Sequence, residues 1–75
     1  MSEVGESEEL GVIEEWFEHR DHRLQYHTTA DGRVLDAEWM AVVVHVDGTP
    51  AYVTGYGATQ VKAARSACFR FLRAR

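Results

Sequence analysis

The strongest constraint on the fold comes from residues 39–72, where two strand patterns and one helix pattern follow one another with short connections. Residues 39–46 form an apolar run with four valines, which is typical of a strand, and Asp47-Gly48 directly after it is typical of a tight hairpin turn. Residues 52–56 predict the returning strand, and the Ala- and Arg-rich residues 60–74 predict a helix. We therefore expect an antiparallel hairpin followed directly by a helix that packs against it.

The side chains of the strand at residues 39–46 alternate between two faces of the sheet, and both sets are largely apolar. We expect one set to face the core and the other to face away from it: Met40, Val42, Val44 and Val46 in the first set, and Trp39, Ala41, Val43 and His45 in the second. Pro50 cannot donate a hydrogen bond to a neighbouring strand, so the strand near it is predicted to lie at an edge of the sheet.

The N-terminal part of the chain predicts one further helix and one further strand. Leu10, Ile13 and Phe17 recur with helical spacing after Ser7, a residue that can cap a helix. Residues 24–29 are rich in aromatic and β-branched side chains, which favours a strand. The predicted order is α-β-β-β-α, an α+β fold in which two helices cover one face of a three-stranded antiparallel sheet.

Length and periodicity predict the domain organisation. The chain has 75 residues, enough for one small domain. Residues 1–6 lack apolar periodicity and are expected to form a disordered tail, with a single domain over residues 7–75. The sequence contains no apolar run long enough to cross a membrane, and the single cysteine, Cys68, cannot form an internal disulfide, so we expect a cytoplasmic location.

Charge is distributed unevenly along the chain. Residues 1–18 contain seven glutamates and no base, whereas residues 48–75 contain five bases and no acid, within a formal net charge of −4. Nucleic-acid-binding domains usually carry a basic excess, because contacts with phosphate dominate their affinity. Two interpretations stay open: the two ends neutralise one another when packed side by side, or an acidic helix shields a basic one.

The order and spacing of these elements resemble a double-stranded RNA-binding domain over residues 10–72. Glu15-Trp16 matches a Glu followed by an aromatic residue in the first helix of that family, and Gly57-Ala58-Thr59 matches the Gly-x-Ser before its second helix. The other matched positions are two strand residues and the packing positions of the second helix: Tyr26, Met40, Ala63, Ala67, Cys68, Phe71 and Leu72. Most of these are packing positions, so the resemblance implies the fold more strongly than the function.

The resemblance implies that the first helix and the loop after the first strand would contact duplex RNA, which the family recognises by shape through 2′-hydroxyls and phosphates. Glu15 keeps the polar group that the family places in a minor groove, but Glu14 and Glu18 beside it repel phosphate. The loop position where the family has a histidine is Asp36, and the proline of that loop motif is missing. These departures predict a weakened contact with RNA.

The second helix departs further from the RNA-binding pattern of the family. Its three lysine positions correspond to Gln60, Val61 and Ala64. Lys62 and Arg65 lie one position away from that motif, on a different side of the helix, where Arg73 joins them. Because affinity and its salt dependence scale with the number of neutralised phosphates, the loss of three lysines predicts weak RNA binding at best.

Catalytic and metal sites have little support in the sequence. His19, His22 and His27 are close in sequence, but structural zinc sites usually contain paired cysteines or a longer ligand array. Cys68 lies on the apolar side of the second helix, and Ser66 has no base placed to activate it. We therefore expect neither an enzyme nor a bound metal, cofactor or small-molecule substrate.

Two surfaces are predicted to contact proteins. One is the outward face of the sheet, with Trp39, Val43 and His45 and with Tyr52 on the edge strand; the other is Phe69 with its basic neighbours. The predicted function is a non-catalytic protein-interaction module that binds a protein partner or a second copy of itself, with no membrane contact. The alternative is weak or non-standard double-stranded RNA binding through the basic face of the second helix, with Glu15, Lys62, Arg65 and Arg73.

Overall fold

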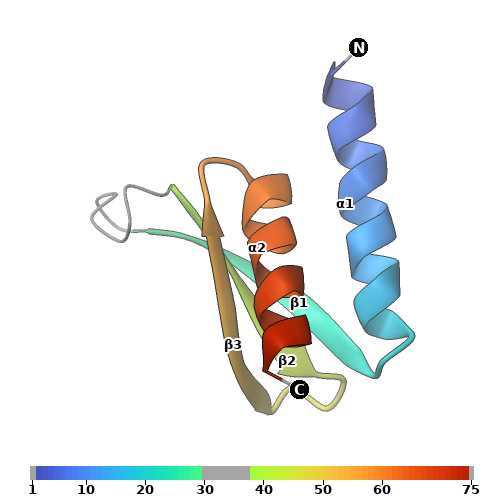
Figure 1. Ribbon diagram of the computed structural model, residues 1–75, viewed down its shortest axis with the longest axis vertical. Helices are drawn as coiled ribbons and strands as arrows, with labels where there is room; N and C mark the ends of the chain where they lie inside the picture. Colours follow the sequence, from blue (N-terminus) through green and yellow to red (C-terminus); the bar gives the residue numbers. More distant parts are fainter. Residues whose placement is uncertain (1, 30–37, 75) are drawn as a thin grey trace.

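The computed structural model describes residues 2–29 and 38–74, which form a helix, three strands and a second helix (Figure 1). Their bounds are α1 Ser2–Glu18, β1 His22–Thr28, β2 Trp39–His45, β3 Pro50–Gly57 and α2 Gln60–Arg73. The predicted α-β-β-β-α order is confirmed. Asp31, Gly32 and Asp36, which the sequence places in the loop between the first two strands, lie outside the described residues.

The described strands form one antiparallel sheet in the order β1-β2-β3, so that β2 is central and β3 is an edge, as Pro50 predicted. Val43 in the middle of β2 pairs with Leu24 of β1 and with Val53 of β3. The register between β2 and β3 shifts next to Val43, which leaves a bulge in β3. Tyr52 lies in this bulge with a φ of 61°, a left-handed conformation that is unusual for a tyrosine.

Asp47 and Gly48 form the predicted turn between β2 and β3. Gly48 adopts a φ of 90°, which glycine tolerates because it has no Cβ. The carboxylate of Asp47 accepts hydrogen bonds from the amide and the hydroxyl of Thr49, at 3.0 and 2.7 Å. These hydrogen bonds from Thr49 hold the pKa of Asp47 below its ordinary value, because they stabilise the charged carboxylate.

Both helices pack on the same face of the sheet, with α2 over β2 and β3 and α1 beside α2 and β1 (Figure 1). The core between the two layers contains small and medium apolar side chains around one phenylalanine: Phe17, Ala41, Val43, Val53, Ala63 and Ala67. The ring of Phe17 is fully buried and packs edge-on against Trp16 and Phe71, with ring centroids 5.0 and 5.3 Å away.

The backbone of α2 lies directly against β3 at two glycines. A Cβ atom added to Gly55 would lie 2.1 Å from the amide nitrogen of Ala67 and 2.3 Å from the carbonyl oxygen of Ala63. A Cβ atom added to Gly57 would lie 2.6 Å from the amide nitrogen of Ala63. Gly55 and Gly57 are therefore required for close packing of α2 on β3.

The faces of β2 are the reverse of the prediction. Ala41 and Val43 are fully buried beneath the helices, and Trp39 packs against the same core. Val44 is also buried, but it lies outside the core cluster, on the opposite face of the sheet with Met40 and Val42. The interpretation of Trp39 and Val43 as an exposed contact strip is therefore wrong.

The physical reason lies in the neighbouring strand. Both faces of β2 are apolar, so alternation alone does not decide which face is covered. Ala41 pairs with Gly55 and Trp39 pairs with Gly57, which places the glycines of β3 on the same face as these two residues. That face offers the room in which α2 can approach the sheet, so it becomes the covered one.

The first helix begins earlier than predicted. Its backbone is helical from Ser2, so Ser7 lies inside α1 and does not cap the helix. The segment before Ser7 has no proline, it is rich in glutamate, and a glycine inside a helix costs only about 1 kcal/mol. Among the described residues, neither helix combines the length and the apolar composition needed to span a membrane.

Candidate protein-contact surface on the helices

The two helices run side by side in the same direction (Figure 1). Two of the contacts between them show which residues lie at the same height. Near the start of α2, Arg65 forms an ion pair with Glu9, and two turns later the ring of Phe71 packs edge-on against Trp16, with ring centroids 5.7 Å apart. Trp16 follows Glu9 by seven positions and Phe71 follows Arg65 by six. Residues that are paired at one contact are therefore followed by residues at nearly the same height two turns later.

The ion pair between Glu9 and Arg65 is bidentate. The Nε and Nη2 groups of Arg65 donate to the two carboxylate oxygens, with Nη2 2.6 Å from Oε1 of Glu9. The hydrogen bond from Arg65 lowers the pKa of Glu9 below its ordinary value. Both side chains are partly exposed, so the pair adds little to stability. Its larger consequence is that an acid of α1 neutralises a base that the sequence offered for RNA binding.

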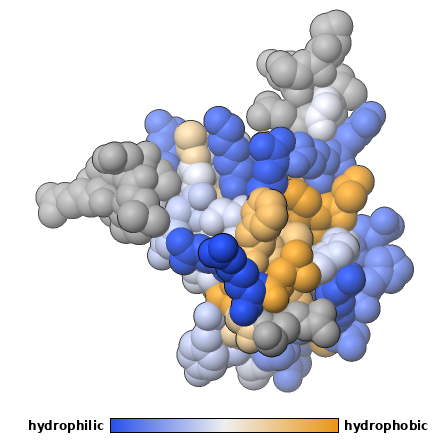
Figure 2. All heavy atoms as spheres, viewed as in Figure 1, coloured by the Kyte–Doolittle hydropathy of each residue, from blue (hydrophilic) through white to orange (hydrophobic). Residues whose placement is uncertain are grey.

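Large apolar side chains are exposed on the outer side of the two helices. The exposed fractions are 66% for Val12, 69% for Phe69 and 49% for Leu72. Val12 lies one turn after Glu9 and Phe69 one turn after Arg65, so these two side chains lie at about the same height. Figure 2 shows hydrophobic atoms gathered over α2 and the neighbouring side of α1, with hydrophilic atoms on both sides. We call Val12, Phe69 and Leu72 the helical patch.

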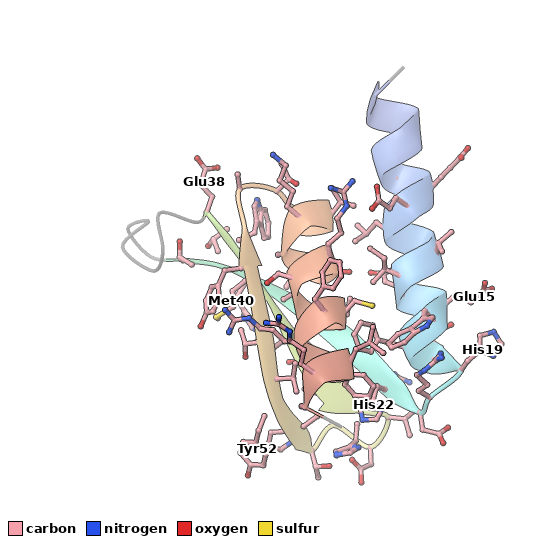
Figure 3. All side chains as sticks on the ribbon, in the orientation of Figure 1. Glu15, His19, His22, Glu38, Met40 and Tyr52 are labelled. Carbon is pink, nitrogen blue, oxygen red and sulfur yellow. The ribbon has the colours of Figure 1, made fainter. Side chains whose placement is uncertain are left out.

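Exposed charges of opposite sign border the helical patch. Glu8 and Glu15 lie one turn before and one turn after Val12 on α1. Lys62 lies two turns before Phe69 on α2, and Arg73 lies one turn after it. Glu15 projects from the side of α1 that faces away from α2 (Figure 3). The patch therefore has an acidic margin along α1 and a basic margin along α2.

The predicted protein-contact residues do not form one surface. Val43 lies in the core and Trp39 packs against it, whereas Tyr52 is 90% exposed and projects from the bulge of β3 (Figure 3). Tyr52 lies beside an open depression lined by Thr54, Arg70 and Arg73, among others. Phe69 is exposed as predicted and lies on the helical patch.

Two of the four histidines lie together where β1 begins and β2 ends. His22 and His45 are paired across β1 and β2, with ring centroids 4.6 Å apart, and His22 also packs edge-on against Phe71, at 4.8 Å. Nδ1 of His22 lies 2.6 Å from the carbonyl oxygen of Arg20. Within residues 2–29 and 38–74, the structure places no three His, Cys, Asp or Glu side chains so that they could hold a metal ion.

The predicted RNA-contact residues all lie on the helical layer. Lys62, Arg65 and Arg73 occupy the outer side of α2, as expected, but Arg65 is bound by Glu9. Glu15 is on the far side of α1 and does not join them.

Sequence reasoning missed Val12, Leu72 and Glu9 as surface residues. Leu72 was assigned to the buried side of α2, but Phe71 fills the space beside Trp16 and Phe17, which leaves Leu72 half exposed. Local periodicity gives no signal for the Glu9–Arg65 pair, because these residues are 56 positions apart.

Comparison of this chain with known protein families, with curated proteins and with solved structures finds no match in any of the three. The resemblance to the double-stranded RNA-binding domain therefore stays a prediction from the sequence. The function has to be inferred from the chemistry of the surface.

Proposed function

We propose that this chain is a non-catalytic protein-interaction module of the double-stranded RNA-binding-domain type, which contacts its partner through the helical patch. The observation that carries the proposal is the joint exposure of Val12, Phe69 and Leu72 on neighbouring helices. Apolar side chains gathered on a surface and bordered by charge are typical of protein-contact sites. An aromatic residue beside basic ones, as Phe69 is beside Arg73, is also typical of the residues that dominate binding energy.

Weak double-stranded RNA binding through α2 is the alternative, and the Glu9–Arg65 pair counts against it. A phosphate that approaches Arg65 meets a carboxylate that already binds the guanidinium with both oxygens and neutralises its charge. Glu8 and Glu15 add negative charge on the neighbouring helix.

We propose that the chain functions in the cytoplasm, where Cys68 stays a thiol.

The test uses the full chain with an affinity tag, expressed in its native host, together with the variant Phe69→Ser. Because the Phe69 side chain is largely exposed, the variant should melt at the wild-type temperature. We expect proteins that co-purify with the wild-type chain to be lost from Phe69→Ser. The matched control is Tyr52→Ser, which removes an exposed aromatic side chain outside the helical patch and should retain the partner. An identical set of bound proteins for the wild type and Phe69→Ser would exclude the patch as the contact surface.

A gel shift with an RNA duplex of about 20 base pairs tests the alternative function. This length suffices because a double-stranded RNA-binding domain spans about 16 base pairs. Submicromolar binding near physiological salt that is lost in Lys62→Glu would favour RNA as the ligand.

A further inference from the structure

We propose that the partner of the helical patch is a second copy of this chain, related to the first by a two-fold axis that runs parallel to the helices. This inference rests on the proposed function, because it uses the same patch. It starts from the observation that the patch has an acidic margin on one helix and a basic margin on the other.

Two symmetric arrangements bring two helical patches face to face with all the helices aligned along one direction, and charge distinguishes them. If the two-fold axis runs parallel to the helices, α1 of each copy lies on α2 of the other. If the axis runs across the helices, α1 lies on α1 and α2 lies on α2. The first arrangement brings Glu8 and Glu15 of one copy to Lys62 and Arg73 of the other, twice. The second brings like charges together, which disfavours it.

The heights of the residues along the helices also match in the first arrangement. An axis parallel to the helices leaves the height of each residue unchanged, and the Glu9–Arg65 pair shows which residues of the two helices are level. With a rise of about 1.5 Å per residue, three pairs meet to within about 3 Å along the helix axis. They are Glu8 with Lys62, Val12 with Phe69, and Glu15 with Arg73.

The position of the charges around the helices agrees with this arrangement. Glu15 projects from the side of α1 away from α2, so in the dimer it lies over the outer margin of the partner's α2, where Arg73 is exposed. The apolar side chains of Val12, Phe69 and Leu72 then form the centre of the contact, and the charged pairs form its rim. A rim of charged pairs determines the orientation of the two copies more than their affinity. The contact area is small, because each copy contributes only three large apolar side chains. We therefore expect monomers and dimers in exchange, with a dissociation constant in the micromolar range or weaker.

The test measures the mass of the full chain by sedimentation across protein concentrations from micromolar to millimolar. The wild type should pass from monomer to dimer. Phe69→Ser, and separately Glu8→Lys with Glu15→Lys, should weaken the dimer by about tenfold or more. The decisive variant combines Glu8→Lys, Glu15→Lys, Lys62→Glu and Arg73→Glu, which exchanges the two margins and keeps the formal net charge at −4. This variant should dimerise with about the wild-type affinity.

Thermal melting of every variant checks that its fold is intact. A wild-type chain that stays monomeric at millimolar concentration overturns the inference. If it does so while another protein still co-purifies in a Phe69-dependent manner, the proposed function stands and self-association fails. A dimer that Phe69→Ser leaves unchanged, or a charge-exchanged variant that stays monomeric, overturns the two-fold geometry.

Discussion

Tyr26 on β1 donates a 2.6 Å hydrogen bond to the carboxylate of Glu14 on α1. This contact ties the first helix to an edge of the sheet. Burial of the phenol, and after it the hydrogen bond to Glu14, raises the pKa of Tyr26 well above its ordinary value of 10.0. Since the pKa is higher in the folded chain than in the unfolded one, the stability that this group contributes is fully present below about pH 10 and is lost as the pH rises further.

Tyr26→Phe should therefore change both the size of the unfolding free energy and its pH dependence. At neutral pH we expect a loss of about 1 kcal/mol, because the hydrogen bond to Glu14 is removed. Above about pH 10, the unfolding free energy of the wild type should fall more steeply than that of the variant. Denaturant unfolding across this pH range measures both effects. If the unfolding free energy falls equally in the two proteins above about pH 10, a group other than Tyr26 causes the fall.

Gly55→Ala should prevent or severely weaken folding. The added Cβ atom would lie 2.1 Å from a backbone atom of Ala67, which cannot move without shifting α2. Gly11→Ala is the matched control, since a Cβ atom at Gly11 meets nothing within 4 Å and the residue lies in a helix. We expect Gly11→Ala to raise stability by about 0.5–1 kcal/mol. Thermal melting of both variants checks the difference, and similar melting temperatures would contradict the close contact of α2 with β3.

Val43→Ala tests which face of β2 is covered. Val43 is fully buried beneath the helices, so removal of its methyl groups should cost about 2 kcal/mol. Val42 is half-buried on the opposite face, and Val42→Ala should cost less than about 1 kcal/mol. Chemical denaturation gives both values. The reverse order of the two losses would restore the orientation that alternation alone predicted.

Tyr52 offers a test of backbone strain. Its φ of 61° costs a tyrosine about 1 kcal/mol or more, and its side chain is largely exposed. Tyr52→Gly should therefore keep or slightly raise the unfolding free energy, although a large side chain is lost. Tyr52→Val should lower it by about 1–2 kcal/mol, because β-branched residues tolerate this conformation least. Loss of stability in both variants would show that the tyrosine ring itself stabilises the bulge.

RNA binding should be weak and should respond to Glu9. Near physiological salt we expect a dissociation constant no tighter than tens of micromolar for a duplex, with a salt slope of about −1 to −3. Glu9→Gln removes the charged competitor of Arg65, so it should make the slope steeper by about one unit. Titrations at several salt concentrations measure both slopes. An unchanged slope in Glu9→Gln would mean that Arg65 does not contact phosphate.

Local chemistry explains which parts of the fold could be predicted from the sequence. The hydroxyl of Thr59 accepts a hydrogen bond from the amide of Lys62 at 3.2 Å, as expected of a helix cap. The Asp47-Gly48 turn and the edge position of the strand at Pro50 also depend on neighbouring residues, and both are confirmed. Each of these features is decided within a few positions of the chain.

Features that depend on distant residues could not be predicted in the same way. The covered face of β2 depends on the glycines of β3 and on the alanines of α2, because both faces of β2 are apolar. The candidate site also contains one feature that could be predicted and one that could not. Exposure of Phe69 followed from its position on the polar side of α2, whereas its alignment in height with Val12 depends on how the two helices lie side by side.

The Glu9–Arg65 pair also couples the packing of α1 against α2 to the affinity of Arg65 for anions. A carboxylate held on the same molecule acts at a high effective concentration, so an external anion competes with the contact between the helices for Arg65. Coupling of this kind is reciprocal. Whatever draws α1 away from α2 strengthens anion binding at Arg65, by the same factor by which a bound anion loosens α1.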